Sequence, residues 1–313
     1  MFLVINFKTT LMPYFSRTLF FRFTLCFIVL ILTACNEPTI HWRVVHVSGH
    51  NQSGDAHILK FPSGKTIMLD TGFAHYANRY LIPALQEQKI TSIDKLLISH
   101  AHRNHYGAIP KLLEQFQIDE VFFNLPPADS CRKEIWHTGC SMEHILSVQK
   151  LIKEKSSLKN IAEGDLIYQE KDISLKALYY LDKAPSIIPG IGVNDASIVF
   201  KLEFGETSVL FTGDLGPSAS HYILKKTSDS ASKLKSTAMT APHHGVAATV
   251  TNDFFDQVQP EIVIASISKS VWDSDRGKQT REYFQQKKTP IYVTGEIGNI
   301  DITITKKKIE IEQ

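Results

Sequence analysis

Apolar and polar positions along the chain predict many short strands, separated by a few amphipathic helices. Strands are expected at 42–47, 56–61, 66–70, 96–98, 120–124, 173–181, 198–204, 207–212, up to 241, 262–266, 291–294 and 300–305. Helices are expected at 76–88, from 109 to about 116, and at 142–155, 253–259 and 279–287. Strands therefore dominate both halves of the chain.

The two halves of the chain share one pattern of predicted strands. In each, a hairpin's second strand ends in a carboxylate, Asp70 in the first half and Asp214 in the second. Two β-rich halves of this kind suit a pseudo-symmetric sandwich of two sheets with helices outside. Residues 125–160 break the pattern, and we interpret them as an insertion near the site that carries substrate contacts.

The N-terminal segment resembles an export signal. Lys8, Arg17 and Arg22 precede a short apolar run that ends in Leu32-Thr33-Ala34-Cys35, which is similar to a bacterial lipoprotein cleavage box. We expect residues 1–34 to be removed, with Met12 as an alternative start, and Cys35 to carry the lipid. A single membrane anchor or an early start site is the alternative. Residues 35–43 would then be a linker, and Asn36 favours an outer-membrane location facing the periplasm.

Composition suits one large domain, with 43% hydrophobic and 21% charged residues in 313. Removing the three cations of residues 1–34 changes the formal charge from +2 to −1. A domain near neutrality has no broad positive field, so charge does not support a nucleic-acid partner.

Two cysteines remain once Cys26 leaves with the signal and Cys35 is lipidated. Cys131 and Cys140 lie in one loop of an exported domain and are expected to form a disulfide. Zinc binding by this pair is the less favoured interpretation, because no second cysteine pair completes a tetrahedral site.

Three histidines in one short loop carry the strongest chemical signal. The stretch from His100 to Gly107 follows an apolar strand and precedes an amphipathic helix. Imidazole commonly binds divalent transition metals, and His100 and His102 can reach one ion from the same edge of the turn. His105 points another way and would suit a second ion. A polar loop whose histidines only form hydrogen bonds is the alternative.

The loop resembles the His-x-His-x-Asp-His signature of the metallo-β-lactamase superfamily, with Asn104 at the aspartate position. Other motifs follow in the expected order: Ser53-Gly54-Asp55-Ala56, Met68-Leu69-Asp70-Thr71-Gly72, Phe211-Thr212-Gly213-Asp214 and Ala241-Pro242-His243-His244-Gly245. Together they look most like the soluble hydrolase domain of ComEC-type DNA-uptake proteins, over about 44–304. The resemblance implies an α/β (α+β) fold, a four-layer αββα sandwich, over 44–313.

The resemblance also implies a metal site of one or two zinc ions, with manganese as the alternative. The implied ligands are His100 and His102 for the first ion, His105 for the second, Asp214 as the bridge, and one of His243 and His244, with His243 preferred. Asp70, Asp214 and Asn104 are the expected catalytic positions. Asp70 can also hold a ligand histidine from behind, although a simple turn aspartate is equally consistent with the sequence.

The chain departs from the superfamily pattern at several places. No histidine lies between His144 and His221, where most members carry another ligand. That region instead holds Asn194 and Asp195, which are expected to line the site, as in ComEC-type domains. The neutral amide of Asn104 predicts a weaker second ion, close to one ion per chain and slow hydrolysis. Residues 272–276 also differ from the ComEC-type pattern, which leaves the substrate contacts there open.

The expected function is a lipid-anchored metallohydrolase that activates water against an ester. A phosphodiester is the preferred substrate, although the superfamily also cleaves lactams, thioesters and lactones. No Gly-x-Ser-x-Gly elbow occurs, so a serine hydrolase has no comparable support. The alternative is a metal-poor binding lipoprotein that keeps the fold without turnover.

Overall fold

The computed structural model describes residues 37–133, 139–181, 192–227, 233–246 and 250–312. The expected signal segment, Met12 and Cys35 lie outside these residues. The compact unit Pro38–Gln313 holds the elements described below. None of the helices within the described ranges combines the length and apolar character needed to cross a membrane.

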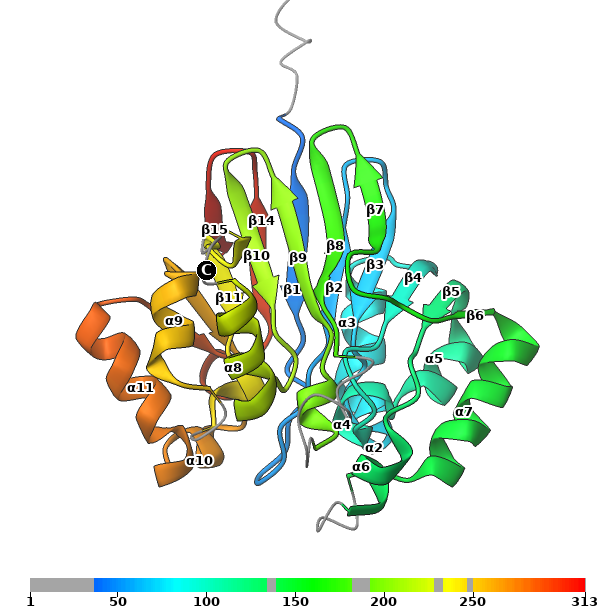
Figure 1. Cartoon of the computed structure of the whole chain (residues 1–313). Helices are drawn as coiled ribbons and strands as arrows, with labels where there is room; N and C mark the ends of the chain where they lie inside the picture. Colours follow the sequence, from blue (N-terminus) through cyan, green and yellow to red (C-terminus); the bar gives the residue numbers. More distant parts are fainter. Residues whose placement is uncertain (1–36, 134–138, 182–191, 228–232, 247–249, 313) are drawn as a thin grey trace, which may run out of the picture. The chain divides into compact units, whose positions relative to one another are not determined.

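Two sheets form the centre of this unit (Figure 1). The first has the strand order β15-β14-β1-β2-β3-β4-β5-β6, and the second the order β13-β12-β11-β10-β9-β8-β7. The strands of the first sheet are β1 (Ile40–Val44), β2 (His57–Lys60), β3 (Thr66–Leu69), β4 (Ser92–Leu97), β5 (Gln117–Phe122), β6 (Ser157–Lys159), β14 (Ile300–Ile304) and β15 (Ile309–Glu312). Those of the second are β7 (Leu166–Glu170), β8 (Ile173–Tyr179), β9 (Val199–Phe204), β10 (Thr207–Phe211), β11 (Ala238–Thr240), β12 (Ile262–Ala265) and β13 (Ile291–Val293).

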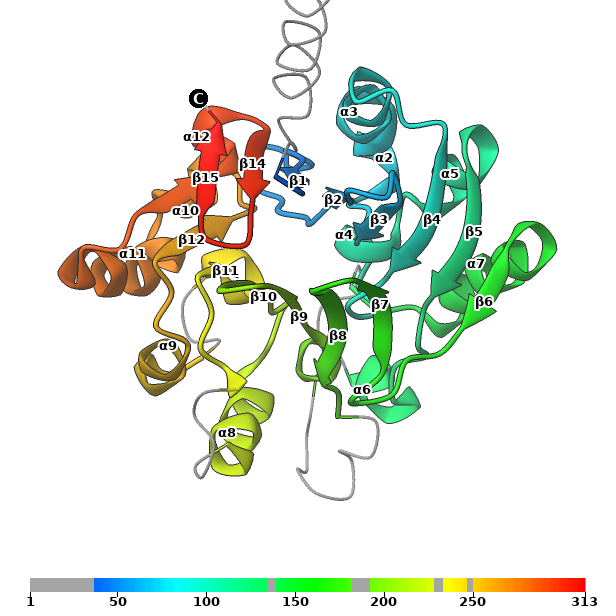
Figure 2. The same cartoon turned by 90° about the horizontal axis from the view of Figure 1, so that it is seen from above.

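Helices cover the outer faces of both sheets, as Figure 2 shows. The first sheet carries α2 (Ala74–Tyr76), the π-helical turn η1 (Ala77–Leu81), α3 (Ile82–Glu87), α4 (Arg103–Tyr106), α5 (Ile109–Gln115), α6 (Ala128–Lys133) and α7 (Met142–Lys155). The second carries the 3₁₀ turns η3 (Asn194–Ala196) and η5 (Pro242–Gly245), and helices α8 (Pro217–Lys226), α9 (Asn252–Val258), α10 (Lys269–Trp272), α11 (Asp275–Lys287) and α12 (Thr294–Ile297). This arrangement confirms the predicted αββα sandwich.

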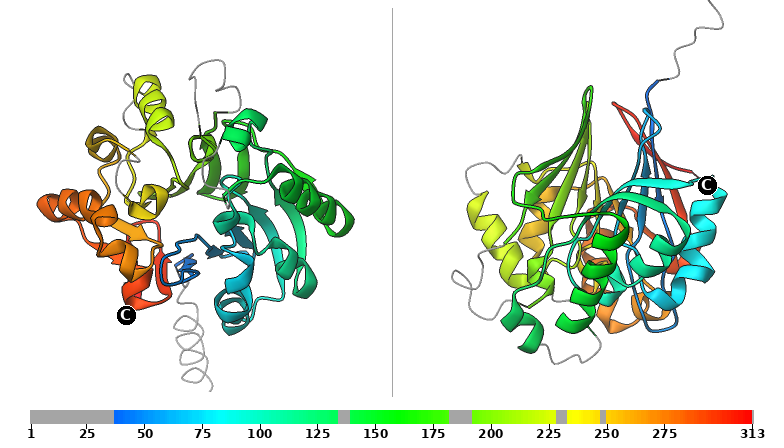
Figure 3. Two further views of the ribbon diagram at one scale, coloured as in Figure 1. Left: turned by 90° about the horizontal axis from the view of Figure 1, so that it is seen from below. Right: turned by 90° about the vertical axis from the view of Figure 1, so that its right-hand side faces the viewer.

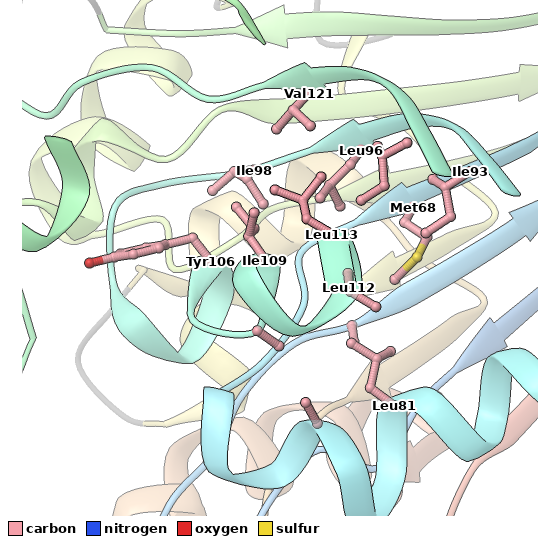
Figure 4. Close-up of a cluster of buried hydrophobic side chains, with 14 of the residues drawn as sticks. Met68, Leu81, Ile93, Leu96, Ile98, Tyr106, Ile109, Leu112, Leu113 and Val121 are labelled. Carbon is pink, nitrogen blue, oxygen red and sulfur yellow. The ribbon is translucent and has the colours of Figure 1, made fainter. Parts of the chain in front are cut away.

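Three apolar clusters hold the layers together. The inner faces of the two sheets meet in one cluster, which includes Trp42, Phe200 and Phe211. A second cluster lies between the first sheet and its helices, where Leu112 of α5 packs near Met68 of β3 (Figure 4). A third lies between the second sheet and α8, α9 and α11. Each sheet is thus apolar on both faces, which explains why several of its strands are continuous apolar runs.

Several elements differ from the sequence expectations. Helix α7 has the predicted bounds, but its residues Ile145, Val148 and Ile152 are part of the core. The segment 125–160 is therefore mostly a layer of the domain, and its expected role as an insertion was wrong for α7. Strands β6, β7 and β15 were not predicted. They are edge or near-edge strands, where half-exposed positions blur the alternation of apolar and polar residues. Strand β1 begins inside the segment expected to be a linker.

The sandwich has two different ends. The tight turns of the hairpins β2–β3, β9–β10 and β14–β15 gather at the upper end in Figure 1. Strands β3, β4 and β5 are parallel, as are β10, β11 and β12, so their carboxyl ends lie together at the opposite end. Figure 3 shows that end from below. The loops that leave it carry the candidate site residues.

Candidate metal centre

The histidine loop leaves the carboxyl end of β4 and passes directly into α4. Ile98 still bonds to β5, through its N–H to the Phe122 carbonyl at 2.9 Å, so the chain stays extended up to Ser99. His102 precedes the first turn of α4, and His105 lies within that turn. The ring of His105 lies against that of His100, with centroids 4.1 Å apart, and its Nε2 faces Oδ1 of Asp214.

Asp70 fixes the orientation of His105. Its carboxylate accepts hydrogen bonds from the Ser99 N–H and hydroxyl, both at 2.7 Å, and lies 2.8 Å from His105 Nδ1. Nδ1 therefore carries the proton, and Nε2 is left to face the site. Both carboxylate oxygens of Asp70 accept hydrogen bonds from Ser99 or His105, on the side of His105 that faces away from the donor groups. Asp70 therefore orients His105 and does not face substrate.

Asp214 occupies the centre of the site and is held by the second half of the domain. Gly213 before it adopts φ +52°, and the Asp214 N–H donates to Ser197 Oγ at 3.1 Å. Ser197 is followed by Ile198, whose N–H donates to the Ser99 carbonyl at 2.9 Å. That hydrogen bond joins the two halves of the domain next to the histidine loop, so Asp214 reaches the histidines of the first half.

The two oxygens of Asp214 face two different sets of imidazoles. Oδ2 lies 3.6 Å from Nε2 of His100 and 3.6 Å from Nε2 of His243. Oδ1 lies 3.2 Å from Nε2 of His105 and 3.4 Å from Nε2 of His244. Two ligands of one tetrahedral zinc, each about 2.0–2.1 Å from the ion, are themselves roughly 3.3 Å apart. The spacings fit ligands around two ions that share one carboxylate.

Two groups of donor atoms emerge from this geometry. His100, His102 and Asp214 form one, and Asp55, His105, Asp214 and His244 form the other, with the donor atoms of each group within 4.8 Å of one another. Within the second group, His105 Nε2, Asp214 Oδ1 and His244 Nδ1 are buried without any hydrogen-bond partner. Buried polar atoms are rarely left unpaired, and a metal ion would satisfy those that face the common point. The residues present therefore fit a metal centre.

The His243-His244 pair has a left-handed backbone, and of the two only His244 belongs to a donor group, the second one. His243 has φ +49° and His244 has φ +61°, conformations that cost non-glycine residues on the order of 1–2 kcal/mol each. The His243 N–H donates to the Gly213 carbonyl at 3.0 Å, which ties the turn to Asp214. Strain of this kind persists where the surrounding structure holds it, and commonly at functional sites. The sequence favoured His243 as the ligand, whereas the structure places His244 in the buried group.

Asp55 joins the second group, which sequence reasoning missed. Its N–H donates to the Asn104 carbonyl at 3.2 Å, and its Oδ1 lies 3.5 Å from His244 Nδ1. A Cβ on Gly54 would come within 2.9 Å of that same carbonyl oxygen, so glycine permits the close approach. In the sequence, the signal for Asp55 is the Ser53-Gly54-Asp55-Ala56 motif, which is part of the resemblance to the superfamily.

Asn104 lies beside His244 but brings no charge. Its Nδ2 donates to the Ser53 carbonyl at 3.1 Å and lies 3.0 Å from His244 Nε2. The expectation of a weak second ion relied on a missing negative charge at this position. Asp55 places a carboxylate in the same group, so that charge argument loses its basis.

Burial and mutual charge set the protonation of these groups. Burial raises the pKa of Asp55, but the charges of His244, His57 and His105 outweigh it and bring that pKa to about 2. Burial lowers the pKa of His105, yet Asp214 and Asp70 together raise it well above its ordinary value. Burial lowers the pKa of His243 to about 4 despite the neighbouring Asp214. An ion that binds His105 must therefore displace a proton, so its affinity falls on acidification.

The other predicted residues lie further from the donor atoms. Asp195 is buried, and its Oδ1 accepts a hydrogen bond from Ala219 N–H at 2.9 Å in the first turn of α8. Its carboxylate therefore caps the first turn of α8, and Asp195 belongs to neither donor group. Asn194 has a buried Oδ1 without a hydrogen-bond partner. His144 bonds to the Tyr106 hydroxyl at 2.9 Å, in agreement with a structural role.

The cysteine pair and residues 272–276 contribute to the structure of the domain. Cys131 and Cys140 are joined by a disulfide with an S–S distance of 2.16 Å and a Cα–Cα distance of 5.3 Å.

Trp272 is buried, and a Cβ on Gly245 would lie 3.1 Å from its ring. Trp272 thus packs beneath the His243–Gly245 turn, and the Arg281 guanidinium lies 5.5 Å from its ring centroid.

Comparisons with known proteins agree with this geometry. Residues 52–121 match the family model described as the Metallo-beta-lactamase superfamily. ComE operon protein 3 of Bacillus subtilis (strain 168) is 24% identical over 196 residues, which cover 61% of this chain and 22% of that protein. Endoribonuclease ysh1 of Schizosaccharomyces pombe (strain 972 / ATCC 24843) is 24% identical over 191 residues, 57% of this chain and 23% of that one. The chain thus spans less than a quarter of the length of these relatives.

Among solved structures, a CmlA beta-hydroxylase mutant superposes with a TM-score of 0.51 at 12% identity. The superposition covers 94% of this chain and 60% of that one. At this identity the likeness concerns the fold alone, and it extends over nearly the whole chain.

Proposed function

We propose that the chain carries a metallo-β-lactamase superfamily hydrolase domain, which cleaves a phosphodiester in a metal-dependent reaction. The observation that carries the proposal is Asp214, whose two oxygens each face two imidazole Nε2 atoms at 3.2–3.6 Å. A buried carboxylate placed in this way is suited to bridge two zinc ions, with manganese as the alternative metal.

The protein groups have separable roles in this proposal. His100, His102, His105, His244, Asp214 and Asp55 would hold the metal. Zinc bound there lowers the pKa of a coordinated water towards about 7 and polarises a phosphoryl oxygen. Asp70 keeps His105 in the tautomer that leaves Nε2 free, and Ser99 holds Asp70 in turn.

A surface cavity with a volume of about 670 Å³ lies near the histidine loop, and Lys153, Lys159 and Asp165 are among its lining residues. Asn124, Leu125 and Tyr180 line this cavity and also the small hollow against His100. The ysh1 relative is named an endoribonuclease, and it supports a phosphodiester by analogy.

The test combines metal content with turnover. We expect the purified domain to contain zinc or manganese by mass spectrometry and to hydrolyse bis-p-nitrophenyl phosphate, with activity lost after chelation and regained with metal. His100→Ala should lose metal and activity together, whereas His144→Ala should keep both. A purified domain that contains little metal and releases no nitrophenolate with any added metal would instead favour the metal-poor binding lipoprotein.

We further propose that the domain is anchored in the bacterial cell envelope through Cys35, facing the periplasm. The Leu32-Thr33-Ala34-Cys35 sequence supports this proposal, because the thiol would carry the lipid once residues 1–34 are removed. Cys35→Ser should therefore leave the protein uncleaved or mislocalised in cell fractionation. A mutant that matures and fractionates like wild type would exclude lipidation.

A further inference from the structure

His57 is a polar side chain buried between the two sheets, next to the candidate metal centre. It is the first residue of β2 and is only 3% exposed. It shares a face of that strand with Leu59, which belongs to the apolar cluster between the sheets. Its ring packs against Trp42 of β1 and Phe211 of β10, with centroids 5.8 and 5.5 Å away. Burial of a polar ring among apolar side chains is unfavourable unless its nitrogens have partners, so both nitrogens of His57 need an explanation.

One nitrogen is occupied by a tryptophan, and this fixes the position of the ring proton. Nε1 of Trp42 donates a hydrogen bond to Nδ1 of His57 at 3.3 Å. An indole N–H can only donate, so Nδ1 accepts with its lone pair and carries no proton. The proton of the neutral imidazole is therefore on Nε2. Trp42 also packs edge-on against Phe211, with centroids 5.2 Å apart, which holds the indole in place.

The second nitrogen faces a carboxylate of the metal centre. Nε2 of His57 lies 3.8 Å from Oδ1 of Asp55, the same oxygen that lies 3.5 Å from Nδ1 of His244. A distance of 3.8 Å is too long for a hydrogen bond, but a buried N–H this close to a carboxylate oxygen still attracts it. His57 itself belongs to neither donor group. It therefore contacts a residue of the second group without being a member of that group.

We propose that His57 is a positioning residue for Asp55: its Nε2–H, set by Trp42, holds the carboxylate in the orientation that binds the second ion. The arrangement reverses that of Asp70 and His105, where a carboxylate orients a histidine. Here a histidine orients a carboxylate, and an indole orients the histidine. This inference rests on the proposed function, because it assumes that the second donor group holds a metal ion.

Two amide substitutions separate the two nitrogens of His57. The side-chain amide of asparagine ends at about the position of Nδ1, and that of glutamine at about the position of Nε2. His57→Asn therefore keeps an acceptor for Trp42 and loses the donor to Asp55, whereas His57→Gln keeps that donor. In stepwise zinc titration of the full chain, we expect His57→Asn to bind the second ion about 10–100-fold less tightly. His57→Gln should bind it with the wild-type affinity.

A double variant tests whether the effect of His57 passes through Asp55. Once Asp55→Asn has removed the carboxylate, adding His57→Asn should weaken the second ion no further, because the two residues act as one unit. Urea denaturation of the metal-free proteins measures stability separately. If His57 only satisfied the N–H of Trp42, His57→Gln would be the less stable variant, and neither variant would lose zinc affinity selectively. The control is His144→Asn, which removes a histidine bonded to the Tyr106 hydroxyl and should leave both zinc affinities unchanged.

The titrations decide the proposal through the second ion. Wild-type affinity for that ion in His57→Asn would overturn it, as would an equal loss in His57→Asn and His57→Gln. If His57→Asn does not fold, His57→Gln still decides, because a selective loss of the second ion in that variant would overturn the proposal. Wild-type protein without affinity for zinc, manganese or cobalt would refute the metal-dependent function itself, and this inference with it.

Discussion

Asp70 and Asp214 occupy comparable places in the two halves of the domain, yet they do different work. Each lies shortly after the second strand of a hairpin, is buried, and contacts a serine from the neighbouring segment. Asp70 receives two hydrogen bonds from Ser99 and one from His105, whereas Oδ1 of Asp214 has no hydrogen-bond partner. A carboxylate whose oxygens all accept hydrogen bonds orients its neighbours, whereas a buried carboxylate oxygen without a hydrogen-bond partner is suited to bind a metal ion.

Substitution of Asp214 is expected to have the largest effect on metal binding and activity. Asp214→Asn removes the charge that both donor groups share, so we expect both ions and all hydrolysis to be lost. Metal analysis and the phosphodiester assay would show this, with circular dichroism to verify folding. Because the bridge itself is gone, millimolar zinc should not restore activity. Recovery with added metal would mean that Asp214 only orients its neighbours.

Asp55 should give the next largest effect. The carboxylate of Asp55 supplies the second group with the charge that Asn104 does not bring, and Asp55→Asn removes it. We expect the second ion to bind more than about 100-fold less tightly. That loss is larger than the one caused by mutating a residue that only orients a ligand. Asn104→Asp in the same protein should recover much of the affinity by returning the charge beside His244. Titration with zinc measures both. No recovery in the double variant would show that the two positions are not interchangeable.

Asp70→Asn should have a milder effect of a different kind. The amide no longer accepts the His105 Nδ1 proton as a charged partner, so we expect about 10–100-fold weaker metal binding or activity. The ligands themselves remain, and excess metal should restore turnover. The contrast with Asp214→Asn under added zinc is the decisive measurement. Equal, unrescued loss in both variants would remove the distinction between them.

The disulfide gives the smallest expected change and serves as a test far from the carboxylates. Cys131→Ser/Cys140→Ser opens a short loop, so we expect a loss of unfolding free energy on the order of 2–3 kcal/mol. Urea denaturation measures it, and metal content should stay at the wild-type value. Mass spectrometry of protein from the periplasm should find the two wild-type thiols oxidised, and free thiols there would contradict the bond.

By itself the sequence determined the identity of most donor atoms and the end of the molecule where they meet. His100, His102 and Asp214 each follow a predicted strand, and the carboxyl ends of neighbouring parallel strands share one edge. Local periodicity locates the strand ends, because strand type and strand end are encoded over a few residues. The choice of Asp214 as a ligand came from the resemblance to the superfamily. The two-sheet sandwich followed from the same patterns.

Only the tertiary structure decided which side chain faces which oxygen. Asp55 enters the site through a hydrogen bond to Asn104, and His243 is aimed by its bond to Gly213, 30 residues away in the chain. Asp195 looked like a site residue and instead caps α8. Such directions depend on contacts between segments distant in sequence, and local periodicity contains no record of them.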